Sequence, residues 1–302
     1  MNAIEIRNLT KNFGPKQAVN GLNMTVPEGA IYGFIGENGS GKSTTEKIIC
    51  GLIHESGGTV KLYGKPHTDV DIRANMGVLI EAPGCFPGLS VWNNMMIQAA
   101  NLRIENAEQE VVKVLKTVRM EGAAGNKYKN CSLGMKQRIG IAMALLGDPA
   151  LLILDEPING LDTDGMRIMR EILVDITQNY GCTVLISSHL LGELEKIATH
   201  YGIIRQGRMI MEMSAEEMDS RAQVFTSLKT AELQKAWFLL TKKYADVRME
   251  DGYIRIYDID DVEEIVTYLM ENGHIVSEIK KNKIGLEEYY IELMSKQGGN
   301  RK

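Results

Sequence analysis

The sequence predicts an α/β fold with a mostly parallel sheet, followed by a small α+β domain. Short apolar segments alternate with stretches of helical periodicity over the first two thirds of the chain, one apolar segment runs into a glycine-rich loop, and another ends in two acids. Strands separated by helices form parallel sheets, whose ligands bind beyond the carboxyl ends of the strands. We therefore expect a site where these two segments end.

The first predicted elements are mostly strands. Residues 4–9 and 22–26 alternate between apolar and polar side chains, as half-buried strands do, and a turn at Pro27-Glu28-Gly29 follows. Residues 30–35 form an apolar run that predicts a buried strand, and residues 44–53 have helical spacing. Two further strands are predicted over residues 59–63 and 76–80.

The loop between that buried strand and helix reads Gly36-Glu37-Asn38-Gly39-Ser40-Gly41-Lys42-Ser43-Thr44 and matches the pattern G-x-x-x-x-G-K-[ST]. Its glycines let successive N–H groups face one concavity, and the helix adds its positive end. This predicts a triphosphate site, in which Lys42 bridges the phosphates and the Ser43 hydroxyl binds Mg²⁺. The flanking strand and helix disfavour the alternative, a glycine-rich turn with a chance lysine.

Three stretches of helical spacing then predict a helical insert of about residues 82–146, with Ser90 and Ser132 as caps of two of its helices. Apolar strands return at residues 151–154 and 183–186. The remaining elements of this part are a helix over about residues 163–179 and a hairpin over residues 202–213.

The strand over residues 151–154 ends abruptly in Asp155 and Glu156. Unpaired carboxylates beside a core are costly unless a positive charge lies nearby, and Mg²⁺ with a triphosphate supplies one. We expect Asp155 to hold Mg²⁺ and Glu156 to accept or orient the proton of an attacking water. A solvated pair of acids is the alternative, and the glycine-rich loop upstream disfavours it.

Residues 222–302 form the second predicted domain, after a first domain of residues 1–221. The predicted order of its elements is β-α-β-β-α-β with a terminal helix, which is compatible with a ferredoxin-like fold. Fold analogy of this kind assigns no function.

Composition restricts the possible partners and compartments. Lys and Arg number 34 against 39 Asp and Glu, so the net charge is -5 and nucleic acid is not an expected partner. The four cysteines lack the spacing of a metal or redox motif, which favours a reducing cytoplasm. No apolar stretch approaches the roughly 20 residues that cross a bilayer, so a membrane role would require a partner.

The string Ser132-Leu133-Gly134-Met135-Lys136-Gln137-Arg138 opens the last helix of the insert and could present a hydroxyl and free N–H groups to a second anion. Taken alone, it could equally be an ordinary helix cap. Together with the glycine-rich loop, the LLILDEP strand, Asn159-Gly160-Leu161-Asp162 and Ser187-Ser188-His189, it resembles the nucleotide-binding subunit of ATP-binding cassette (ABC) transporters. The resemblance covers residues 1 to about 213. It implies a P-loop NTPase cassette: a parallel-sheet core, an antiparallel β subdomain and the helical insert.

The resemblance also implies roles for individual residues. Phe13 matches the aromatic residue that stacks on adenine, and Ser132 and Gly134 match signature residues that contact ATP held by the opposite subunit. Asp162 matches the acid that links the two sites, and His189 the histidine that contacts the γ-phosphate. Two such subunits sandwich two ATP molecules and drive membrane domains. As alternatives, Phe13 packs on the sheet and His189 is a loop histidine with ordinary partners.

Two departures from the common family pattern point to one branch. The signature lacks the first glycine and the glutamine of L-S-G-G-Q, and Glu81 stands where most members have glutamine. Both, with Ala82-Pro83 and Phe86-Pro87, are similar to the branch that exports or protects against bacitracin and lantibiotics. We expect Glu81 to ligate Mg²⁺ or to repel the phosphates without it, and to couple the ATP state to the membrane partner; a structural loop acid is the alternative.

Apolar residues of the insert are candidates for contact with that partner, because Met and aromatic side chains suit adaptable contacts. A groove for a segment of the membrane subunit and an ordinary core are both open interpretations of this set. It comprises Phe86, Leu89, Trp92, Met95 and Met96.

The sequence therefore predicts a Mg²⁺-dependent ATPase that works as a homodimer at the inner face of the cell membrane, powering a separate permease for peptide antibiotics. A soluble ABC protein acting on ribosomes or DNA is the main alternative, and a non-catalytic regulatory module that ATP clamps is the third. Guanine specificity has no support, because Lys129 stands where the motif N-K-x-D needs an aspartate.

Overall fold

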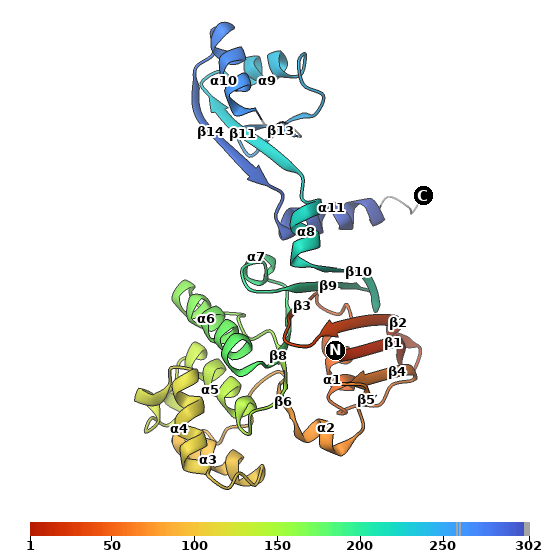
Figure 1. The fold of residues 1–302 in the computed structure, drawn as a ribbon, viewed down its shortest axis with the longest axis vertical. Coiled ribbons are helices and arrows are strands. Elements are labelled where there is room, and N and C mark those ends of the chain that lie inside the picture. Colours follow the sequence, from red (N-terminus) through yellow and green to blue (C-terminus); the bar gives the residue numbers. More distant parts are fainter. Residues whose placement is uncertain (258, 260, 299–302) are drawn as a thin grey trace. The chain divides into compact units, whose positions relative to one another are not determined.

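The computed structural model describes residues 1–257, 259 and 261–298, and its chain divides into two compact units, Met1–Glu216 and Glu217–Lys302. The first unit contains two sheets and the second unit contains one (Figure 1). Each unit has its own apolar core.

The first unit begins with a four-stranded antiparallel sheet in the order β2-β1-β4-β5. Buried and exposed side chains alternate along the inner stretches of β1 and β2, which confirms the half-buried strands predicted there. The strands are β1 (Asn2–Phe13), β2 (Lys16–Pro27), β4 (Gly57–Leu62) and β5 (Lys65–Pro66).

A six-stranded sheet in the order β10-β9-β3-β8-β7-β6 forms the centre of this unit. All neighbouring strands are parallel except β9 and β10, which confirms the predicted parallel sheet. Ser187 near the end of β8 pairs with Phe34 of β3 on one side and with Asp155 of β7 on the other, so these three strands end at one edge. The strands are β3 (Ile31–Ile35), β6 (Met76–Leu79), β7 (Leu151–Asp155), β8 (Thr183–Ser188), β9 (His200–Arg205) and β10 (Arg208–Ser214).

The helices of this unit include the predicted insert. Ser90 and Ser132 cap two of them by accepting hydrogen bonds from backbone N–H groups, as expected. The short helices α2 and α7 were not predicted, because four or five residues show no clear period. The helices are α1 (Lys42–Ile49), α2 (Val70–Ala74), α3 (Val91–Asn101), α4 (Ala107–Thr117), α5 (Leu133–Leu145), α6 (Thr163–Tyr180) and α7 (Leu191–Leu194), with 3-10 turns at Glu121–Ala123 and Tyr128–Asn130; α8 (Ala215–Arg221) spans the boundary of the two units.

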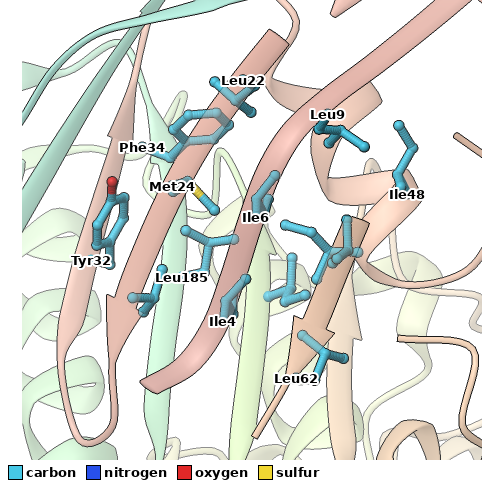
Figure 2. Packing of buried hydrophobic residues seen from close by; sticks show 14 of the residues in the cluster. Ile4, Ile6, Leu9, Leu22, Met24, Tyr32, Phe34, Ile48, Leu62 and Leu185 are labelled. Atoms are coloured by element: carbon cyan, nitrogen blue, oxygen red, sulfur yellow. The ribbon is translucent and has the colours of Figure 1, made fainter. Parts of the chain in front are cut away.

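The core of the first unit lies between its two sheets. Figure 2 shows Ile4, Ile6 and Leu22 of the antiparallel sheet near Phe34 and Leu185 of the parallel sheet. Burial of such side chains is the main favourable contribution to folding. In this way the core fixes β3, and with it the loop that follows β3.

Helix α5 of the insert packs very closely on the outermost strand of the parallel sheet. A Cβ at Gly77 of β6 would lie 2.0 Å from the backbone oxygen of Ala144, and one at Gly140 would lie 2.9 Å from a methyl group of Leu79. Only glycine fits at Gly77, because backbone cannot yield as a flexible side chain can. The insert is thereby anchored to the sheet that carries the site.

The second unit has the order β-α-β-β-α-β followed by a helix. Its four strands form an antiparallel sheet in the order β12-β13-β11-β14, the connectivity of ferredoxin-like domains. Ala236 and Leu240 of one helix and Ile265 and Leu269 of the other belong to its core. The elements are β11 (Val224–Thr230), α9 (Leu233–Leu240), β12 (Val247–Glu250), β13 (Tyr253–Tyr257), α10 (Val262–Glu271), β14 (Val276–Lys283) and α11 (Leu286–Gly298).

Within the described part of the chain, no helix is both long enough and apolar enough to cross a bilayer.

Candidate active site

The loop between β3 and α1 forms a concave backbone cradle at the edge where the parallel strands end. Gly39 and Gly41 have φ of 79° and 115°, which side chains with a Cβ rarely adopt. At Gly36, a Cβ would lie 2.5 Å from Ser40 Oγ and 2.6 Å from the carbonyl oxygen of Ile204. The tight backbone therefore requires these glycines, as the motif predicted.

The first turn of α1 is open to an anion. The helix begins after Gly41, and no side chain caps it. Its first N–H groups can therefore donate hydrogen bonds to a bound anion. Lys42 is 95 % buried, and its Nζ donates hydrogen bonds to the carbonyl oxygens of Gly36 (2.6 Å) and Glu37 (3.4 Å). Asn38 and Gly39 at the crest are exposed, and Ser43 and Thr44 are half-buried. The predicted phosphate-loop residues thus form one tight loop, which the side chain of Lys42 closes by its bonds to Gly36 and Glu37.

Asp155 at the end of β7 faces α1. Its carboxylate accepts hydrogen bonds from Ser43 Oγ (3.4 Å) and Ser187 Oγ (2.7 Å). Sequence reasoning overlooked Ser187 as a partner, although the parallel register of β7 and β8 puts these two residues side by side. The carboxylate and the Ser43 hydroxyl are therefore brought together, as the two motifs predicted.

Glu156 follows immediately and lies between two basic side chains. Its Oε1 is 3.9 Å from Lys42 Nζ, and its Oε2 is 2.9 Å from Nδ1 of His189. The backbone of Glu156 has a φ of 49°, an unfavourable conformation for a residue with a Cβ, and its N–H donates to the backbone oxygen of Ser187 (3.1 Å). Such strain persists only where the surrounding structure holds it. The carboxylate is thereby aimed back over the cradle.

Glu46 of α1 is a further acid that sequence reasoning missed. Its side chain is completely buried, and neither carboxylate oxygen has a hydrogen-bond partner. The nearby Ser187 hydroxyl has a single proton, which it donates to Asp155. Burial and the charges of Asp155 and Glu156 raise the pKa of Glu46 to about 8. The sequence offered only the presence of an acid four residues after Lys42 in the predicted helix, and the structure shows that this position is buried.

The signature residues lie in a different setting. The Ser132 hydroxyl caps α5 by accepting the N–H of Met135 (3.3 Å), and Asp162 caps α6 by accepting the N–H of Gly165 (2.8 Å). Both line a cavity of about 430 Å³ together with Gly134 and Leu133. Leu133 is 50 % exposed. These residues are brought together with one another.

Two predicted residues have partners that the sequence did not indicate. Phe13 at the end of β1 is 50 % exposed, and Lys11 lies over its ring at 5.0 Å. Half of its surface is therefore open to solvent, as a residue that stacks on a nucleotide would need. Glu81 forms an ion pair of 2.8 Å with Lys47 of α1, which lowers the pKa of the Glu81 carboxyl.

The oxygen atoms at the end of β7 suit a hard divalent cation that takes some of its ligands from the protein and others from bound phosphates. Among the described residues, no three or more His, Cys, Asp and Glu side chains form a metal cluster. Mg²⁺ does not need one, because it is commonly held by one or two carboxylates, waters and substrate phosphates. Ser43 and Asp155, beside the cradle, fit this requirement.

Comparison with known proteins identifies the family. The model of the ABC transporter family matches residues 19–159. The chain is 37 % identical over 300 residues to the bacitracin transport ATP-binding protein BcrA of Enterococcus faecalis, across 98 % of this chain and 97 % of that protein. The chain belongs to the ABC transporter ATP-binding proteins. This confirms the resemblance to ABC transporter subunits and the cassette fold that the sequence predicted.

Other ABC proteins agree with this assignment. The lantibiotic transport ATP-binding protein SrtF of Streptococcus pyogenes is 37 % identical over 224 residues, 74 % of this chain and 96 % of that one. Among solved structures, CbiO1 of Clostridium perfringens, part of the ABC transporter complex CbiONQ, is similar with a TM-score of 0.67 and 26 % identity, covering 73 % of this chain and 91 % of that one. As a member of this family of ATPases, the chain binds ATP.

Proposed function

We propose that this ABC ATPase uses Mg²⁺ and ATP to power a separate membrane permease that exports, or protects the cell against, peptide antibiotics of the bacitracin and lantibiotic type. The observation that carries the proposal is similarity to a bacitracin transport ATP-binding protein along nearly the whole of both chains. The lantibiotic transport relative supports the same class of cargo. Through its permease, the subunit would lie at the cytoplasmic face of the membrane.

The phosphates of ATP would lie in the cradle formed by residues 36–44. Its backbone N–H groups and the Lys42 ammonium would bind the phosphates, for which Lys42 exchanges its present carbonyl contacts. Ser43 and Asp155 would hold Mg²⁺, which when bound neutralises phosphate charge and orients the γ-phosphate. Phe13, exposed at the end of its strand, would stack on adenine.

Glu156 is the proposed general base. A positioned carboxylate can accept or orient the proton of the attacking water. Its contact of 2.9 Å with His189 supports this role, because the imidazole holds the carboxylate in place and is itself partly exposed, so that a bound nucleotide could reach it. Lys42, on the other side of Glu156, completes the group.

Ser132 and Gly134 would complete the site of a second copy of this chain, and Asp162 would link the two sites. Gly134 supports this idea, because a Cβ at this position would meet only Leu161, at an ordinary 3.5 Å. The fold of the single chain therefore does not require a glycine here. A requirement for glycine would come from a group outside the chain, and ATP held by the second copy is that group.

The permease would contact the surface beside Glu81. A cavity of about 390 Å³ there is lined by Ile80, Ala82 and Pro83 of the loop and by Met143 of α5. Of the apolar residues for which the sequence left a groove and a core open, Met95 is completely buried and belongs to the core. Phe86 remains 57 % exposed and available to a partner. Glu81, at the edge of this surface, would couple the ATP state to the permease.

The test is resistance to peptide antibiotics in cells that carry the chain with the membrane protein that co-purifies with it. We expect the wild-type complex to raise tolerance to bacitracin or a lantibiotic, Glu156→Gln to abolish the gain, and the exposed-site control Glu108→Gln to retain it. Co-sedimentation with ribosomes, without any membrane protein, would contradict the proposal and support the soluble alternative.

A further inference from the structure

The loop of residues 81–87 joins the parallel sheet to the helical insert, and side chains fasten both of its ends. It follows β6 and leads to α3. Its first residue, Glu81, has a φ of 66°, in the left-handed region that residues with a Cβ seldom occupy. A residue in this conformation needs contacts that hold it there.

At its start, the loop is fastened to the helix of the phosphate cradle. Lys47 Nζ donates a hydrogen bond of 2.8 Å to Glu81 Oε1, and this bond raises the pKa of the lysine. Lys47 belongs to α1, which begins directly at the glycine-rich loop. The side chain of Glu81 is 73 % exposed and that of Lys47 is 34 % exposed. An ion pair this open to water is weak.

At its far end, the loop is fastened by Asn94 of α3. The Asn94 side chain is 98 % buried, and its Oδ1 accepts the backbone N–H of Phe86 at 2.7 Å. Its Nδ2 donates to the carbonyl oxygens of Phe86 (3.2 Å) and Ser90 (2.9 Å). A buried amide with these three hydrogen bonds is costly to detach. The far anchor is therefore permanent, whereas the near anchor is weak.

We propose that Lys47 is a releasable anchor, which holds Glu81 on the phosphate-loop helix in the absence of nucleotide and gives it up when ATP and Mg²⁺ bind. The proposal rests on the function proposed above, because the competitor for Glu81 is the metal of bound ATP. Release would free the start of the loop while Asn94 keeps its end on the insert. Lys47 is thus a positioning residue for Glu81.

The competition follows from electrostatics. Lys47 follows Ser43 by four residues on α1, so the two side chains lie on the same face of the helix. Ser43 in turn contacts Asp155, the proposed metal ligand, at 3.4 Å, which puts the ion pair about one helical turn from the metal position. A divalent cation at Asp155 repels the Lys47 ammonium and attracts the Glu81 carboxylate, and both effects weaken the pair. Nucleotide without the metal supplies no such charge.

Zero-length carbodiimide cross-linking tests the proposal, because it joins a lysine to a carboxylate only where the two are in contact. Mass spectrometry would quantify the Lys47–Glu81 cross-link in the full-length Glu156→Gln chain without nucleotide, with ATP alone, and with ATP and Mg²⁺. The matched internal control is the ion pair between Lys113 Nζ and Asp148 Oδ1, whose atoms are 2.5 Å apart. This pair does not involve the phosphate-loop residues. Binding of ATP is measured separately by filter retention.

We expect the Lys47–Glu81 cross-link to form without nucleotide, to persist with ATP alone, and to fall at least threefold with ATP and Mg²⁺, while the Lys113–Asp148 cross-link stays constant. An unchanged yield in protein that retains ATP and Mg²⁺ would overturn the releasable anchor and leave the proposed function intact. Failure to retain ATP would overturn both proposals.

Variants of Lys47 provide a second measurement. Lys47→Met removes the competitor of the metal, so we expect the Mg²⁺ concentration for half-maximal ATP retention to fall by about twofold to fivefold, the range of a weak exposed ion pair. Lys47→Arg keeps the charge and should restore the wild-type value. Equal Mg²⁺ requirements for wild type and Lys47→Met would contradict the proposal.

Discussion

The phosphate-loop region and the signature region are built in opposite ways. At the phosphate loop, Lys42 is buried, and Asp155 and Glu156 are tied to Ser187 and His189. At the signature, the side chains of Ser132 and Asp162 accept hydrogen bonds, among the described residues, only from N–H groups of the helices that they cap. The first region is a connected network within one chain. In the second, the two polar side chains are caps of separate helices and are not joined in a network with each other.

The difference between the two regions indicates that a single chain supplies the phosphate-loop half of the nucleotide site in finished form. Buried polar groups must be satisfied internally, so the phosphate-loop half carries its partners with it. The signature half lies beside a cavity of about 430 Å³ and accepts a side chain at Gly134 without a clash. The fold of the single chain therefore does not require a glycine at position 134, whereas the Ser132 hydroxyl already serves as a helix cap.

The largest effect is expected in the phosphate-loop half. Glu156→Gln removes the proposed base but keeps the shape of the side chain, so hydrolysis should fall by about 100-fold or more, as for other positioned bases. ATP binding should be retained, because the cradle is unchanged. Steady-state ATPase and filter-binding assays check this, with Glu108→Gln as the control. Near-normal turnover would refute the role of Glu156.

A substitution in the signature half should also lower the ATPase activity, for a different reason. Gly134→Glu puts an acid in the first turn of α5, where the helix tolerates it, so the stability of the single chain should stay unchanged. In the dimer it blocks ATP of the second copy. Because a misplacement of about 1 Å can cost about 100-fold, we expect at least a tenfold loss of ATPase activity. A fully active variant would contradict the external use of Gly134.

The buried half should also show a cost in stability that the exposed half lacks. The pKa of Glu46 is raised from 4.5 to about 8, so the folded chain holds the proton more tightly and loses stability as pH rises through this interval. Glu46→Gln removes the ionisation and should stabilise the chain by roughly 2–4 kcal/mol at pH 8, and little at pH 4.5. Urea unfolding at both pH values checks this. A gain of the same size at both would contradict the assigned cause.

The smallest effect separates the cap from the contact. Ser132 and Ser90 are equivalent helix caps, with acceptor distances of 3.3 and 3.1 Å, so each change to alanine should cost about 1 kcal/mol of stability. Only Ser132→Ala should also lower the ATPase activity, by a few-fold. Equal activity of the two variants, measured at matched stability, would reduce Ser132 to an ordinary cap.

Most of the cassette could be predicted from the sequence because its central strands are continuous apolar runs, its first strands alternate between apolar and polar residues, and most of its helices are long enough to show a period. The site at the ends of β3 and β7 followed from two motifs and one rule about parallel sheets. What could not be predicted were side-chain contacts between elements far apart in sequence. Lys47 meets Glu81, and Ser187 meets Asp155, through packing that no local pattern records.

Glu46 shows the same limit from another side. Helical periodicity assigned residues 44–53 to a helix without indicating that this acid lies on the buried face, beside Asp155 and Glu156. Only the packing of α1 against the sheet reveals that a carboxyl group is enclosed there. An acid within an otherwise amphipathic helix, next to a phosphate loop, is the signal to look for in related sequences.

We propose that two copies of this chain bind ATP between them, with the phosphate-loop half-site of one copy facing the signature half-site of the other. The most direct test is the mass in solution of the Glu156→Gln chain, which should bind ATP and Mg²⁺ but hydrolyse the ATP very slowly. We predict that its mass doubles with ATP and Mg²⁺, and that the Glu156→Gln/Gly134→Glu double variant stays a monomer while still retaining ATP. A Glu156→Gln chain that binds ATP as a monomer, or a double variant that dimerises equally well, would contradict the claim.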